Sequence, residues 1–123
     1  MSRIPIGIDI IEIYRIEQAM LSWQNSFLRR IYTGSELETC RNVASRLATR
    51  FAAKEAVMKA LSTGTIGLNW RDIEVLSGND GVPSIRLHGR ACEKAREMGV
   101  KEFSVTMSHS RQYATAFVIG YAE

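Results

Sequence analysis

The chain has 123 residues, of which 46% are hydrophobic and 24% are charged, and its formal net charge is +3. This length suits one domain with a real hydrophobic core, and we expect a single domain over residues 1–123. Nothing approaches the roughly 20 apolar residues of a membrane span, and the short N-terminal apolar run does not resemble a signal peptide, so we predict a cytoplasmic protein with no membrane partner.

The first half of the chain predicts one strand and then helices. Residues 4–13 are apolar and β-branched, as in a buried strand. A helix should follow over residues 15–30, and Ser35 with Glu38 forms a capping-box pattern that opens a second helical stretch. The longest helix is predicted from about residue 46 to residue 62.

The second half predicts two strand pairs separated by a short helix. Strands are expected over residues 72–76 and 84–87 around the turn Asn79-Asp80-Gly81. The remaining elements are a helix over 90–98 and strands over 103–108 and 113–119. This order favours an α+β fold in which a mainly antiparallel sheet packs against one long helix and shorter helices.

The long helix carries charges on the face that should be buried. At about 100° per residue, Leu47 and Met58 share an apolar face, and Lys54 points into its middle. Glu55 lies on the edge of this face, and Lys59 is one turn further along. Because a buried charge is costly unless it is paired or bound, Lys54 must have a partner.

Asp9 is the second unusual charge. Aspartate is depleted in strands, and Asp9 interrupts an isoleucine-rich run. It could be a carboxylate held at a sheet edge, where Gly7 on the same face leaves room for a ligand. An equally good alternative is that the strand ends there and Asp9 caps a turn.

Three cations lie around Glu55 on the long helix: Arg50, Lys54 and Lys59. This set suits a site in which carboxylates hold Mg²⁺ and cations neutralise the remaining phosphate oxygens. The simpler alternative for Glu55 and Lys59 is an ordinary i, i+4 pair that stabilises a helix.

His109 lies at the predicted end of a strand, between Ser108 and Ser110. This donor-rich turn could bind phosphate, although a lone histidine in a turn is more often structural or merely exposed. The chain contains no GxSxG sequence, no Walker loop and no histidine spacing typical of a metal site.

Taken together, these residues resemble the 4′-phosphopantetheinyl transferase family. The short length is similar to its holo-acyl carrier protein synthase type. The matching stretches span nearly the whole chain in the family's order. They are Gly7-Ile8-Asp9-Ile10 with Glu12, Tyr32-Thr33 with Glu36, Arg50-Phe51-Ala52-Ala53-Lys54-Glu55-Ala56 with Lys59, and Ser108-His109-Ser110.

The resemblance implies transfer of 4′-phosphopantetheine from coenzyme A to a serine of an apo acyl carrier protein, releasing adenosine 3′,5′-bisphosphate. Asp9 and Glu55 would be the Mg²⁺ ligands, and Lys59 would neutralise or protonate the departing phosphate. Either Glu55 or a metal-ordered water would take the serine proton. The residues expected to hold coenzyme A are Arg50, Lys54, Ser108 and His109.

The resemblance also implies an assembly and a docking surface. Chains of this length resemble members that form homotrimers, in which His109 would serve a site whose Asp9 and Glu55 belong to a neighbour. Short members often carry a basic run in the helix after residue 15, which docks the acidic carrier. Here that run is sparse, so docking should be weaker or more apolar. The docking residues we expect are Arg15, Trp23, Phe27 and Arg30.

Two other functions stay open. One is a family member that binds coenzyme A without turnover, which the intact Asp9, Glu55 and Lys59 argue against. The other is a basic module that binds polyanions, suggested by the net charge alone. Because the aromatic residues do not alternate with basic ones as in single-strand nucleic-acid binders, we expect no nucleic-acid partner.

Overall fold

The structure is a computed structural model that describes residues 4–61 and 68–122, except for the side chains of residues 23 and 24. The predicted order of elements is confirmed. The helices are α1 (Ile13–Ile31), α2 (Gly34–Cys40), α3 (Ala44–Ala60) and α4 (Gly89–Glu97), with a short 3₁₀ turn at Trp70–Asp72. The strands are β1 (Ile6–Glu12), β2 (Ile73–Ser77), β3 (Pro83–Leu87), β4 (Glu102–His109) and β5 (Tyr113–Tyr121). In these described ranges, no helix is both long and apolar enough to cross a membrane.

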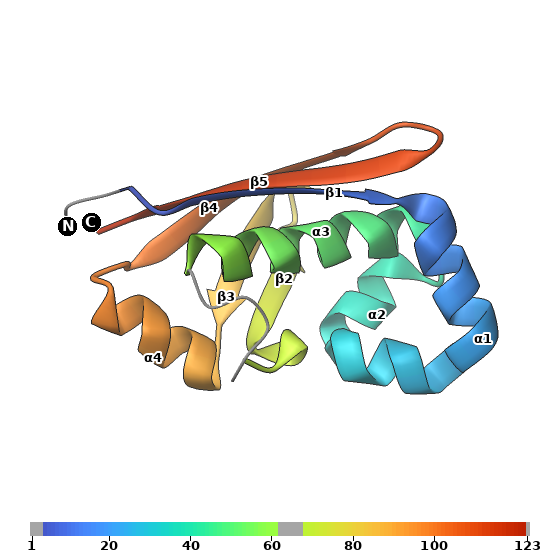
Figure 1. Ribbon diagram of the computed structural model, residues 1–123, viewed down its shortest axis with the longest axis horizontal. Helices are drawn as coiled ribbons and strands as arrows, with labels where there is room; N and C mark the ends of the chain where they lie inside the picture. Colours follow the sequence, from blue (N-terminus) through green and yellow to red (C-terminus); the bar gives the residue numbers. More distant parts are fainter. Residues whose placement is uncertain (1–3, 62–67, 123) are drawn as a thin grey trace.

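The α+β prediction is confirmed, but the antiparallel strands form two sheets instead of one. The larger sheet has the strand order β1-β5-β4, and β2 pairs with β3 alone. Figure 1 shows α3 lying along one face of the larger sheet, with α1 and α2 at one end and α4 at the other. No described element covers the opposite face of this sheet in the same view.

Small side chains let α3 lie close to the sheet. Ala52, Ala53 and Ala56 are fully buried, and they face a β5 strand whose inward residues include Ala114 and Ala116. The first half of α3 shares a core with α1, and its second half shares a core with α4. A single alanine-rich helix therefore connects both parts of the hydrophobic core.

Helix ends differ from the predicted ones in informative ways. The capping box of α2 is formed by Thr33 and Glu36, whose side chains each bond to the other's backbone N–H, and not by Ser35 and Glu38. The long helix begins at Ala44 and ends at Ala60, so its predicted end at residue 62 lies outside the described residues. A capping box was correctly predicted for this helix, but its residues were not. The sequence contains two overlapping capping-box patterns, which cannot be separated by spacing alone.

The backbones of β1 and α3 lie very close together at Gly7. A Cβ atom at this position would lie 1.8 Å from the carbonyl oxygen of Ala56. The prediction that Gly7 leaves room for a ligand on the face that it shares with Asp9 is therefore wrong, because the backbone of α3 fills the space into which a Cβ would project. Gly7 instead allows α3 to lie directly against β1.

Replacing Gly7 with alanine should therefore destabilise the protein by about 1–3 kcal/mol, since β1 and α3 must separate to accommodate the methyl group. Urea unfolding measures the change. Gly34→Ala is the matched control, because no atom lies within 4 Å of a Cβ built at Gly34 in α2. Equal stability of the two variants would contradict this account of Gly7.

Candidate active site

Asp9 and Lys59 meet at the edge of the larger sheet. Asp9 lies in the middle of β1, opposite Ala116 of β5, so the alternative in which it caps a turn is wrong. The Nζ atom of Lys59 lies 3.0 Å from Asp9 Oδ1 and donates to the carbonyl oxygen of Ile8, also at 3.0 Å. The Lys59 side chain is 53% exposed, whereas that of Asp9 is 15% exposed. The carboxylate of Asp9 thus pairs with the ammonium of Lys59, which remains exposed to solvent.

Glu55 adds a second carboxylate to this edge. Burial and the nearby charge of Asp9 raise the pKa of Glu55, while Lys59 opposes the shift. Two carboxylates that repel each other around one exposed ammonium form a site where a divalent cation would relieve the repulsion. Lys59 hydrogen-bonds to Asp9 and to Ile8, so it does more than form a helical pair with Glu55.

The donor set fits Mg²⁺. Among the described residues there is no cluster of three or more histidine, cysteine, aspartate or glutamate side chains that could hold a metal by itself. Mg²⁺ does not need one, because it commonly takes one or two carboxylates and completes its octahedron with water and substrate phosphate. Asp9 and Glu55 are the two carboxylates that could hold it here.

A cavity of about 250 Å³ adjoins Lys59, lined by Ile6, Gly7, Ile8, Lys59 and Phe117. Its outer wall continues into an exposed apolar sheet face. The large residues on that face are Ile6, Ile8, Ile10, Phe117 and Ile119. The cavity is smaller than the roughly 300–1,000 Å³ of most ligand pockets. The cavity beside Lys59 is therefore too small to enclose a large ligand.

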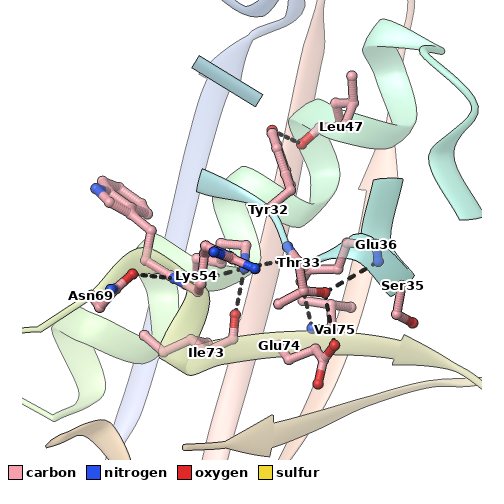
Figure 2. Close-up of polar contacts among 12 residues, drawn as sticks. Tyr32, Thr33, Ser35, Glu36, Leu47, Lys54, Asn69, Ile73, Glu74 and Val75 are labelled. Atoms are coloured by element: carbon pink, nitrogen blue, oxygen red, sulfur yellow. Dashed lines mark hydrogen bonds and ion pairs between the residues drawn. The ribbon is translucent and has the colours of Figure 1, made fainter. Parts of the chain in front are cut away.

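Lys54 does not belong to this site, and its predicted role as a ligand of coenzyme A is wrong. Its side chain is fully buried and points toward α2 and β2, as Figure 2 shows. Its Nζ lies 2.8 Å from Glu36 Oε1 and donates to the carbonyl oxygens of Ile73 and Trp70. The expectation that this buried charge has a partner is confirmed, but the partner is internal.

The predicted phosphate-binding residues lie elsewhere on the chain. Arg50 donates to Ser77 Oγ at 3.2 Å, on a side of α3 turned about 140° from Glu55. Ser108 and His109 end β4, and β5 separates β4 from β1. Because neighbouring strands are about 4.8 Å apart, β4 and β1 lie about 10 Å apart at opposite edges of the sheet. Within one chain, His109 does not join Asp9.

The predicted docking residues separate into different environments on α1. Arg15 and Arg30 are exposed, but Phe27 is only 9% exposed and packs edge-on against Tyr32, so its prediction as a docking residue is wrong. The side chain of Trp23 lies outside the described part. Leu21, 72% exposed on α1, is an apolar surface residue that sequence reasoning missed.

Glu36 was also missed as a charged residue of the interior. Its carboxylate accepts from the backbone N–H groups of Thr33 at 2.8 Å and Val75 at 2.6 Å, in addition to Lys54. The T-x-x-E spacing from Thr33 was the available signal, since it marks a glutamate that is turned back toward the chain.

This chain is similar to known proteins over nearly its whole length. The family model described as the 4′-phosphopantetheinyl transferase superfamily matches residues 5–118. A holo-[acyl-carrier-protein] synthase of Herpetosiphon aurantiacus is 46% identical over 93% of this chain and 95% of its own. One of Dehalococcoides mccartyi is 49% identical over 92% of this chain and 94% of its own.

A solved structure gives the same result for the fold. The crystal structure of Helicobacter pylori holo-[acyl-carrier-protein] synthase in complex with coenzyme A superimposes with a TM-score of 0.85. It is 36% identical, and the match covers 94% of this chain and 99% of the other.

Proposed function

The chain belongs to the 4′-phosphopantetheinyl transferase superfamily, and we propose that it is a holo-acyl-carrier-protein synthase. It moves 4′-phosphopantetheine from coenzyme A to a serine hydroxyl of an apo acyl carrier protein. We further propose that residues 1–123 act as one domain in the cytoplasm. The observation that carries the reaction is the group formed by Asp9, Glu55 and Lys59, two carboxylates and a solvent-open ammonium at one sheet edge.

In the proposed reaction, the serine oxygen attacks the phosphorus that carries pantetheine, and the bond from this phosphorus to the adenosine bisphosphate oxygen breaks. Asp9 and Glu55 would hold Mg²⁺, which when bound would supply Lewis-acid charge and a template for the pyrophosphate. Asp9 also orients Lys59, whose ammonium neutralises the charge on the departing phosphate. Glu55 would accept the serine proton, directly or through water.

The active enzyme is proposed to be a homotrimer with its sites between subunits. Three observations support this. The cavity beside Lys59 is small, His109 lies across the sheet from Asp9, and the sheet face carrying Ile8 and Phe117 is apolar and exposed. A neighbouring copy on that face would bury the apolar side chains and bring its own Ser108, His109 and Arg50 toward the coenzyme A phosphates.

Mixing two inactive variants tests this assembly. Asp9→Asn removes a metal ligand, and His109→Ala removes the proposed phosphate ligand, so each alone should be inactive. Co-expressed as differently tagged chains, they should regain about a quarter of the wild-type sites, because random assortment pairs an intact Asp9 with an intact His109 of the neighbour. Activity of the mixture no higher than that of the separate variants would contradict shared sites.

The function itself is tested by mass spectrometry of the carrier. The full chain is incubated with apo acyl carrier protein, coenzyme A and Mg²⁺, and the carrier should gain the mass of phosphopantetheine. Omission of Mg²⁺ by chelation is the matched control and should stop the reaction. Coenzyme A binding without an adduct on any carrier would support the non-catalytic alternative. Mg²⁺-independent binding to any polyanion would support the basic module.

Carrier docking should depend only weakly on salt. The exposed charges proposed for docking on α1 are Arg15 and Arg30, and Leu21 adds an apolar contact. Electrostatic steering by few charges affects mainly the association rate, which salt screens. We expect titration of carrier affinity against ionic strength to give a shallow slope, and Leu21→Ser to weaken docking at every salt concentration. A steep loss of affinity with salt would contradict the apolar contribution.

A further inference from the structure

We propose that the buried Lys54–Glu36 ion pair positions the active-site face of α3, so that Glu55 and Lys59 meet Asp9 in the correct geometry. This inference rests on the proposed transferase function. It assigns a role in that reaction to two residues that touch neither the substrate nor the proposed metal site.

The buried ion pair leaves no hydrogen-bond donor of Lys54 without an acceptor. Lys54 has three hydrogen-bond acceptors for its three N–H groups: Glu36 Oε1 and the carbonyl oxygens of Trp70 and Ile73. Burial lowers the pKa of Lys54, and the charge and hydrogen bond of Glu36 oppose this. A neutral amine has only two N–H groups, so the ammonium is the form that satisfies all of these contacts.

The ion pair connects several parts of the chain. Glu36 receives its other hydrogen bonds from Thr33 at the start of α2 and from Val75 in β2 (Figure 2). A further contact extends the network, since Thr33 Oγ1 donates to Glu74 Oε2 at 2.7 Å. Lys54 therefore ties α3 to α2 and β2 through directional bonds.

The bonds of Lys54 act on α3 next to the proposed active-site residues. Lys54 precedes Glu55 directly and is turned about 140° from Lys59 around the helix axis. On the β1 side, α3 is held by the close packing of Ala56 over Gly7. A helix of about 6 Å radius that rotated by about 20° would shift a side chain at its surface by about 2 Å. A misplacement of about 1 Å can cost about 10²-fold in rate, so the rotation of α3 must be fixed.

Stability alone does not require an ion pair at this position. Apolar residues of similar volume often replace a buried ion pair without loss of stability, because they avoid the desolvation of both charges. Apolar contacts are not directional, however, and would tolerate small rotations of α3 that an ammonium with three fixed acceptors does not. Directional fixation is what the charges add.

The test removes both charges together. In Lys54→Met/Glu36→Gln no unpaired charge remains, and the glutamine oxygen can still accept from Val75. We expect this variant to melt cooperatively above the assay temperature. Its kcat should be at least about tenfold below wild type, with a KM for coenzyme A within about threefold, because the defect lies in alignment of the reacting groups.

Val57→Ala is the matched control, a truncation of a fully buried apolar residue on the same helix that removes no charge and no hydrogen bond of the ion pair. It should lose about 0.5–3 kcal/mol of stability but keep the wild-type kcat. A wild-type kcat in the double variant, or an equal fall of kcat in Val57→Ala, would overturn the positioning role. An inactive wild-type protein would instead overturn the proposed function.

A milder variant keeps the inference testable if the double variant does not fold. Glu36→Asp keeps both charges but shortens the carboxylate by one methylene group, so Lys54 must follow it or lose contact. We expect a lower melting temperature, because the shorter side chain cannot keep all of its hydrogen bonds, together with a fall in kcat measured well below that temperature. A lower melting temperature with wild-type kcat would show that the pair is only structural.

Discussion

Replacing Glu55 with glutamine is expected to lower the rate of phosphopantetheine transfer by about 10³-fold, because the amide cannot serve as an anionic metal ligand or accept the serine proton. The substitution preserves shape, so the loss reports chemistry and not packing. Rates are measured by mass of the carrier over a range of Mg²⁺ concentrations. Full activity at any Mg²⁺ concentration would remove Glu55 from the proposed site.

The same variant should be at least as stable as wild type when metal is absent. The pKa of Glu55 is raised in the folded state, first by burial and then by Asp9, so its contribution to stability is present below the unfolded pKa and lost as the pH rises through the folded pKa. At neutral pH the carboxylate therefore opposes folding. Melting in the presence of a chelator measures this, with the exposed Glu97→Gln on α4 as the matched control.

The largest effect on stability is expected from Lys54→Met as a single change. It leaves the buried Glu36 carboxylate without a counter-charge, and breaking a buried pair in this way costs about 3–5 kcal/mol. Urea unfolding at neutral pH measures the loss.

Lys59→Met is the matched control, the same substitution one and a half turns further along the same helix. The pair of Lys59 with Asp9 is half-exposed and screened by water, so its loss should change stability by less than about 1 kcal/mol. The two variants should therefore differ strongly in stability, whereas Lys59→Met should lose transfer activity. Equal unfolding free energies for the two would contradict the internal role of Lys54.

Much of the proposed site could be predicted from the sequence, because the patterns that mark its residues involve only near neighbours in the chain. Asp9 interrupts a strand, and Glu55 and Lys59 follow helical spacing, so their types and positions are visible without coordinates. The order of helices and strands and the α+β class followed from periodicity and turn residues in the same way. The motifs also sufficed to identify the family, since family membership depends on residues and their order.

The environments of other residues depended on tertiary packing. Helical periodicity showed that Lys54 enters an apolar face, but its partner Glu36 lies on another helix and could not be selected by spacing. Phe27 was predicted to lie on the surface, but it packs against Tyr32. Gly7 was predicted to leave space beside its Cα, but α3 fills that space. The placement of His109 across the sheet from Asp9 also required the strand order.

The physical reason is the range of the forces involved. Backbone propensity and the alternation of polar and apolar residues act over a few neighbours, so the chain itself shows which residues are chemically unusual: Asp9, Lys54 and Glu55. What each unusual charge contacts is decided by desolvation and packing between segments distant in sequence. For this reason the buried charge of Lys54 forms an internal ion pair, while its neighbour Glu55 faces the proposed site.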